Sequence, residues 1–155
     1  MGSEYDWRTG RTCRYKLHYH LVFTPKYRRS VFTDAMLTRL EAVLRETCEQ
    51  MDGELFEFNG EGDHVHLLAS CPPKTALSNF IGKLKGKSAY VLRNEFWPEI
   101  QNKLWGNQFW SPSYCVVSCG GAPLELVAQY IQDQQRPIDA QAAEQSARRR
   151  KTNGS

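Results

Sequence analysis

The chain is organised around residues 60–69, which read GEGDHVHLLA. The glycines and aspartate of this stretch are typical of a turn, and the apolar residues that follow are typical of a strand. Residues two apart in a strand point to the same face, so His64 and His66 are expected to direct their rings to one spot. Two imidazoles at one spot can bind a divalent metal ion, provided that the fold brings a third ligand there.

The segments on either side of this strand predict a small mixed domain. Alternation and turn residues predict further strands over residues 14–25, 54–59 and 114–118. Apolar residues at helical spacing predict helices over residues 34–52, 75–96 and 123–136. The order β-α-β-β-α-β is that of the ferredoxin-like (split βαβ) fold in the α+β class, an antiparallel sheet with two helices on one face. The third helix is extra to that fold.

The length of 155 residues suits one domain with a sizeable core. We expect this domain over residues 1–137, with a flexible N-terminus over 1–11 and a mobile basic tail over 138–155. No apolar stretch approaches the roughly 18 residues of a membrane-spanning helix. The first residues also lack the apolar core of a signal peptide, so the expected location is the cytoplasm.

The five cysteines are odd in number and include no CxxC pair. In a reducing compartment this pattern predicts free thiols that pack as small apolar residues, and it disfavours a cysteine metal site.

The basic residues gather in three clusters, although the net charge is only +3. The clusters are Lys26, Arg28 and Arg29; Lys83, Lys85 and Lys87; and residues 148–151, which read RRRK. A single cluster is more often ordinary solvated surface than a binding site. Three clusters together favour a polyanionic partner such as a nucleic acid.

The helix predicted over residues 123–136 carries two residues that suit a metal site, Tyr130 and Gln134. Residues four apart share a helix face, so both side chains can reach the same place. The amide oxygen of Gln134 is a neutral ligand, and a set of two imidazoles and one oxygen suits Mg²⁺ or Mn²⁺. The phenol of Tyr130 is a weak nucleophile alone, but it can attack a phosphodiester that a metal polarises.

Each of these residues also has a simpler interpretation. A histidine pair in a strand is often half-buried or on the surface, and a tyrosine on an amphipathic helix usually packs against the core. His18 and His20 form a second same-face pair in the first predicted strand. Periodicity alone does not choose between that pair and His64 with His66.

Four motifs follow one another in a fixed order along the chain. They are residues 19–29, YHLVFTPKYRR; residues 62–68, GDHVHLL; residues 109–114, FWSPSY, with Trp105 shortly before them; and residues 120–134, which begin GGAPL and end YIQDQ. Together they resemble the single-tyrosine (Y1) HUH transposases of the IS200/IS605 type, in which U is a bulky apolar residue, here Val65. The resemblance covers about residues 15–135.

This resemblance implies a role for each candidate residue. His64 and His66 would bind the metal, Mg²⁺ or Mn²⁺, Gln134 would be the third ligand, and Tyr130 would be the nucleophile. Such enzymes cut single-stranded DNA at the ends of an insertion sequence, form a 5′-phosphotyrosine link and leave a free 3′-OH that later rejoins strands. They work without ATP in bacterial and archaeal cells, in association with DNA.

The resemblance also implies partners. Family members act as homodimers with composite active sites and recognise subterminal DNA hairpins. The two clusters Lys26, Arg28, Arg29 and Lys83, Lys85, Lys87 would then supply part of a phosphate-contacting surface. The aromatic residues Trp105, Phe109 and Trp110 would either stack on unpaired bases or close the core under an irregular loop.

Three other functions compete with this one. The first is a domesticated, repeat-associated tyrosine transposase that acts on palindromic repeats. The second is a non-catalytic nucleic-acid-binding module on the same kind of sheet. The third is a replication or conjugation relaxase, which the short chain disfavours.

Overall fold

The computed structural model describes residues 7–104, 106, 108–120 and 123–137. Its centre is a four-stranded sheet in the order β4-β5-β3-β6, in which every neighbouring pair is antiparallel. The strands are β3 (Tyr19–Phe23), β4 (Glu54–Gly60), β5 (Val65–Ser70) and β6 (Cys115–Ser118). The predicted ferredoxin-like arrangement is confirmed, because β3 lies between β5 and β6.

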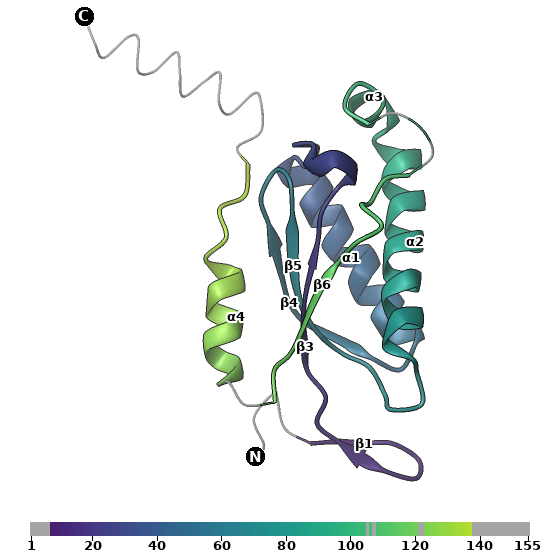
Figure 1. The fold of residues 1–155 in the computed structure, drawn as a ribbon, viewed down its shortest axis with the longest axis vertical. Coiled ribbons are helices and arrows are strands. Elements are labelled where there is room, and N and C mark those ends of the chain that lie inside the picture. Colours follow the sequence, from purple (N-terminus) through teal and green to yellow (C-terminus); the bar gives the residue numbers. More distant parts are fainter. Residues whose placement is uncertain (1–6, 105, 107, 121–122, 138–155) are drawn as a thin grey trace, which may run out of the picture.

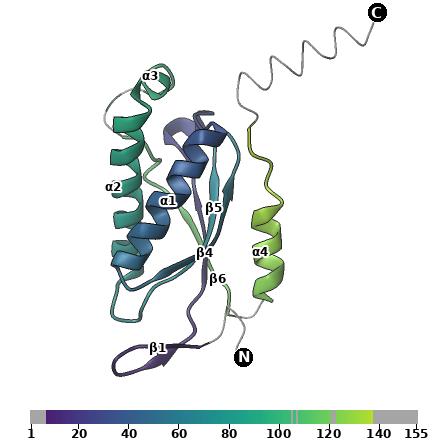
Figure 2. The same ribbon diagram turned by 180° about the vertical axis from the view of Figure 1, so that it is seen from behind.

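The helices cover both faces of this sheet. Helices α1 (Asp34–Gln50) and α2 (Leu77–Glu95) lie on one face, and α4 (Leu124–Gln132) lies on the other (Figures 1 and 2). Two apolar clusters match these layers. The larger joins α1 and α2 to Leu21, Phe23 and Leu67 of the sheet, and the smaller joins α4 to Phe56 and Leu68. Strands β4 and β5 therefore alternate between two apolar environments.

Local signals in the sequence account for the bounds of α1. The Thr33 hydroxyl accepts a hydrogen bond from the Met36 amide at 3.2 Å, which caps the N-terminus. After the helix, Gly53 passes so close to β5 that a Cβ built there would lie 2.4 Å from the Ser70 carbonyl oxygen. A glycine is therefore required where α1 turns back into β4.

The structure differs from the sequence prediction at both ends of the first strand. Residues 14–25 form two pieces, β2 (Arg14–Tyr15) and β3, and β2 pairs with β1 (Arg8–Thr9). Part of the N-terminus that we expected to be flexible is thus a hairpin. A 3₁₀ turn, η1 (Lys26–Arg28), follows β3. The predicted basic tail over residues 138–155 lies outside the described residues.

Two further differences concern the helices. A short helix, α3 (Trp97–Ile100), follows α2 and is absent from the sequence prediction; Pro98 is tolerated in it because it lies in the first turn. Helix α4 ends at Gln132, four residues earlier than predicted. Within the described ranges, none of the helices is both long enough and apolar enough to span a bilayer.

Candidate active site

Two strands bring three histidines to the face of the sheet that α4 covers. His66 on β5 lies opposite Val22 of β3, so His20 is its diagonal neighbour on the same face. Nε2 of His20 and Nδ1 of His66 are 2.9 Å apart, and the two rings stack with centroids 5.1 Å apart. His18 lies just before β3, and its ring packs 5.0 Å from that of Phe56. The register between strands therefore separates the two histidines that periodicity had paired.

His64 lies just before β5 and is held on both sides of its ring. Its Nδ1 is 2.7 Å from Oδ1 of Asp63, and its Nε2 is 3.4 Å from Oε1 of Gln134. The His64 and His66 rings have centroids 5.0 Å apart and are nearly perpendicular. The predicted convergence of these two histidines on one place is thus present in the structure.

Helix α4 brings Tyr130 to the same place. The phenol ring lies edge-on to His66 at 5.4 Å and to His20 at 6.0 Å between centroids. Its side chain is nevertheless 54% exposed, so a strand of nucleic acid can reach it from solvent. Leu124, Ala128 and Ile131 anchor the opposite side of the helix in the smaller apolar cluster. The amphipathic spacing of α4 therefore fixes which way Tyr130 faces.

Gln134 reaches the site although it lies two residues beyond α4. The Asn59 side chain on β4 donates hydrogen bonds to the carbonyl oxygens of Gln132 and Gln134, at 3.1 and 2.9 Å. Arg136 donates in turn to Oδ1 of Asn59 at 2.7 Å and pairs with Asp34 at 3.4 Å. These contacts, which we call the Asn59 clamp, hold the end of the helix against its own sheet.

Burial keeps the central imidazoles in their neutral form. It lowers the pKa of His66 from 6.5 to about 4, with smaller contributions from His20 and His64 nearby, and it also lowers the pKa of His20. A neutral imidazole is the form that binds a metal ion. His66 can therefore present a nitrogen ligand at and below neutral pH.

The chain matches one family model over nearly all of the described residues. The model, described as transposase IS200 like, covers residues 13–134. The chain belongs to the IS200-like transposases. This membership confirms the resemblance drawn from the four sequence motifs, and the activity that it carries is transposition.

Two curated relatives agree with this assignment. The ISDra2 transposase TnpA of Deinococcus radiodurans is 35% identical over 131 residues, which are 83% of this chain and 91% of the relative. The transposase for insertion sequence element IS200 of Salmonella typhimurium is 36% identical over 107 residues, 69% of this chain and 70% of the relative.

Solved structures agree on the fold. A crystal structure assigned to a transposase from Deinococcus radiodurans superposes with a TM-score of 0.65 at 34% identity, covering 84% of this chain and 99% of that one. A REP-associated tyrosine transposase bound to a REP hairpin superposes with a TM-score of 0.56, over 79% of this chain and 70% of that one. Its identity of 12% limits this second likeness to the fold.

The donor atoms of this IS200-like transposase fit a divalent metal. Among the described residues no three His, Cys, Asp or Glu side chains cluster as a metal site, and the Gln134 amide oxygen lies beside Nε2 of His64. Two ligands bound at roughly 2.1 Å and at right angles are roughly 3 Å apart. The 3.4 Å between Nε2 of His64 and Oε1 of Gln134 is close to that separation. Two nitrogens and an amide oxygen suit a hard cation that keeps open positions.

The predicted DNA-contacting residues fall in two separate places. Lys26, Arg28 and Arg29 lie at the 3₁₀ turn after β3, and Arg28 approaches Asp63, the neighbour of His64, at 4.0 Å. Tyr27 and Arg28 adopt positive φ angles of 61° and 50°, a strained conformation that is often found at functional sites. This cluster therefore borders the active site.

The second cluster lies on α2, on the opposite side of the sheet from Tyr130. Lys83 and Lys87 are exposed there, and Lys87 donates to the Gln50 side chain at 2.8 Å. Lys85 is directed inward, and its Nζ donates to the carbonyl oxygen of Ser111 at 2.6 Å. Desolvation lowers its pKa accordingly. The structure thus gives Lys85 a part in holding the segment before β6.

The aromatic segment closes the core. Phe109 and Trp110 are buried, and the Trp110 indole donates to the Ser88 hydroxyl at 3.0 Å. Of the two alternatives for these side chains, the structure therefore favours packing over base stacking. Trp105 lies outside the described residues.

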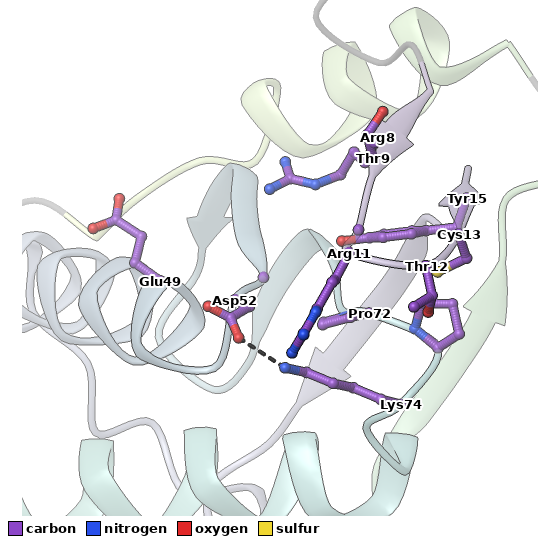
Figure 3. Close-up of a pocket in the computed structure, with 13 residues that line it drawn as sticks. Arg8, Thr9, Arg11, Thr12, Cys13, Tyr15, Glu49, Asp52, Pro72 and Lys74 are labelled. Atoms are coloured by element: carbon purple, nitrogen blue, oxygen red, sulfur yellow. Dashed lines mark hydrogen bonds and ion pairs between the residues drawn. The ribbon is translucent and has the colours of Figure 1, made fainter.

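A cavity of about 700 Å³ lies at the far end of β5 from His64 (Figure 3). The β1–β2 hairpin, the end of α1 and residues 72–74 line it, with Arg11 and the ion pair of Lys74 and Asp52 among its charged groups. None of the predicted active-site residues lines this cavity.

Sequence reasoning missed the contacts that support the site. Asp63 belongs to a sequence motif but has no predicted role of its own, and His20 is predicted only as a rival ligand. Asn59 ends a predicted strand and has no predicted role. The signal for His20 was present, because it shares a strand face with His18, but which histidine meets His66 depends on strand register.

Proposed function

We propose that this transposase cleaves and rejoins single-stranded DNA at the ends of an insertion sequence, with Tyr130 as the nucleophile. The observation that carries this proposal is the position of the exposed Tyr130 phenol edge-on to the buried imidazole of His66, with the His64 ring and the Gln134 amide oxygen beside it. An exposed tyrosine at such a place has no packing role that would explain its contacts.

The chemistry of the proposed step is a transesterification. The Tyr130 oxygen forms a bond to phosphorus, the bond from phosphorus to the 3′ oxygen breaks, and the phenol proton is transferred overall to the leaving 3′-OH. The DNA 5′ end is then linked to the enzyme as a phosphotyrosine. The number of phosphodiester bonds is conserved, so a later attack by a 3′-OH rejoins strands without ATP.

His64, His66 and Gln134 are the residues that would hold Mg²⁺ or Mn²⁺. When bound, the cation would polarise the phosphoryl oxygens and stabilise the charge that develops on them. The sheet orients the two imidazoles, and the Asn59 clamp orients the amide of Gln134.

The partners we propose are single-stranded DNA with subterminal hairpins and a second copy of this chain. Lys26, Arg28 and Arg29 are the stronger candidates for phosphate contacts, because they border the site. Tyr130 contacts His66 of its own chain in the structure, so a composite site in the homodimer requires α4 to exchange between chains. The proposed location is the cytoplasm of a bacterium or archaeon.

Covalent trapping tests the proposed function. The protein is incubated with Mg²⁺ and single-stranded DNA from the flanks of its own gene, and a protein–DNA adduct is sought by denaturing electrophoresis. We expect an adduct with the wild type, none with Tyr130→Phe or His64→Ala, and a normal yield with Tyr90→Phe, another exposed tyrosine on α2.

The same experiment separates the alternatives. An adduct that persists in Tyr130→Phe would show that another residue is the nucleophile. Duplex DNA cut as readily as single strands would contradict the proposed substrate. Tight DNA binding without an adduct under any metal would favour a non-catalytic module. Adducts formed on palindromic repeats, but not on the flanking DNA, would favour the repeat-associated class.

A further inference from the structure

We propose that His20 is a positioning residue of the active site, which accepts a hydrogen bond from Nδ1 of His66 and so turns Nε2 of His66 toward the metal. The inference rests on the proposed function, because it assigns a support to one of the proposed ligands. It concerns a residue that the proposed chemistry does not itself use.

The first step is the sharing of one proton. Nε2 of His20 and Nδ1 of His66 are 2.9 Å apart, which is a hydrogen bond and requires one N–H between them. A neutral imidazole carries a single N–H. If His66 donates, its Nε2 keeps a lone pair for a metal; if His20 donates, the proton of His66 is on Nε2 and that atom cannot be a ligand.

The second step is the comparison with His64. Its Nδ1 lies 2.7 Å from an Asp63 carboxylate oxygen, which can only accept when ionised, so Nε2 of His64 is the atom left for a ligand. Metal-binding histidines commonly donate their second N–H to such an acceptor, which fixes both tautomer and ring orientation. His20 occupies for His66 the place that Asp63 occupies for His64.

The third step is the rigidity of the support. His20 lies on the central strand β3, and its ring stacks on that of His66 with an interplanar angle of 25°. The Tyr130 ring contacts both imidazoles edge-on. His20 therefore supports one proposed ligand and the surface against which the proposed nucleophile rests.

His18 provides a control two residues before His20. It lies just before β3 and is buried where His20 is half-buried, but its ring packs against Phe56. The informative variants are His20→Leu, which removes the acceptor, and His20→Gln, whose Oε1 can accept from about the position of Nε2. His18→Leu tests whether loss of any buried histidine on this face has the same effect.

Affinity for Mn²⁺ is measured by calorimetry or electron paramagnetic resonance on the full chain without DNA. We expect His20→Leu to weaken binding by roughly 10- to 100-fold, the usual effect of losing such a support. We expect the Mn²⁺ affinity of His20→Gln to remain within a few-fold of that of the wild type. The affinity of His18→Leu should equal that of the wild type. Wild-type affinity in a folded His20→Leu would overturn the proposal.

A second measurement keeps the proposal testable if His20→Leu fails to fold. Nitrogen NMR of the wild type with Mg²⁺ reports the tautomer of His66, and we expect the proton on Nδ1. A proton on Nε2 would overturn the proposal. A loss of Mn²⁺ affinity in His20→Gln as large as that in His64→Ala would also overturn the proposal, because such a loss would show that His20 is itself a ligand.

The two proposals can fail separately. If the wild type binds metal but forms no covalent adduct, the proposed function is refuted, while the support of His66 by His20 still stands.

Discussion

At the scale of single residues, the buried histidine His66 makes the stability of the fold depend on pH. Its pKa is lowered from 6.5 to about 4 by burial, so the unfolded chain binds more protons than the folded one between these values. The stabilisation is fully present above about pH 6.5 and is lost as the pH falls toward about 4. It amounts to at most about 3 kcal/mol, since one pKa unit corresponds to about 1.4 kcal/mol.

Urea unfolding between about pH 7 and pH 4.5 measures this contribution. We expect the wild type to lose stability more steeply than His66→Gln, which has no proton to bind at that position. Carboxylates titrate in both proteins, so the difference between the two curves isolates the imidazole. Parallel curves would show that His66 is protonated as easily in the folded state as in the unfolded one.

At the scale of elements, two glycines differ in the space around them. Gly53, in the turn from α1 into β4, is crowded, whereas Gly86, in the middle of α2, is open. A Cβ at Gly53 would lie 2.4 Å from the Ser70 carbonyl oxygen, whereas a Cβ at Gly86 would meet no atom within 4 Å. We expect Gly53→Ala to destabilise the protein by about 1–3 kcal/mol through overpacking. Gly86→Ala should stabilise it by up to about 1 kcal/mol, because alanine favours a helix interior. Thermal unfolding of the two variants measures both effects. If Gly53→Ala were no more destabilising than Gly86→Ala, the result would contradict the close approach at Gly53.

The docking of α4 depends on the Asn59 clamp. Asn59→Ala removes the donor of two hydrogen bonds to carbonyl oxygens, and such a bond contributes about 0.5–1.5 kcal/mol net. We expect faster hydrogen exchange in residues 124–132 and little change in α1 or α2. Asn102→Ala is the control, since its amide bonds an exposed helical carbonyl oxygen of Pro98. Unchanged exchange in α4 would show that its apolar face alone holds it.

The sequence predicts elements better than it predicts contacts between them. Helical spacing and the Thr33 cap locate α1, and two-residue alternation places His64 and His66 on one face, because both signals are local. The meeting of His20 with His66 depends on how β3 and β5 align, and no local pattern encodes that register. The family resemblance favours the second histidine pair over the first, and in the structure His64 and His66 lie beside Gln134 and Tyr130, respectively.

The remaining differences have similar physical causes. An aromatic pair such as Phe109 and Trp110 is equally compatible with a core and with a stacking surface until the packing of α2 is known. The early end of α4 follows from Asn59 on β4, whose side chain donates hydrogen bonds to the carbonyl oxygens of Gln132 and Gln134. Tertiary contacts of this kind override local helical preference.

At the scale of the whole molecule, one chain brings together every residue of the proposed site. The sheet supplies His64 and His66, and the segment from α4 onward supplies Tyr130 and Gln134. The apolar surface that holds α4 is small, with Phe56 and Leu68 on the sheet side. The sheet of a second copy would offer the same surface, so an exchange of α4 between two chains would rebuild the same contacts at little cost.

Mixing two inactive variants tests this exchange. Tyr130→Phe retains the metal-binding histidines, and His64→Ala retains the nucleophile. If α4 exchanges within the proposed homodimer, the mixture contains sites with intact His64 from one chain and intact Tyr130 from the other. We expect the mixture to form the covalent DNA adduct at a fraction of the wild-type yield, with the DNA attached to the His64→Ala chain, which a size tag identifies. If each variant folds and dimerises but the mixture forms no adduct, then Tyr130 acts beside His66 of its own chain, as it lies in this structure.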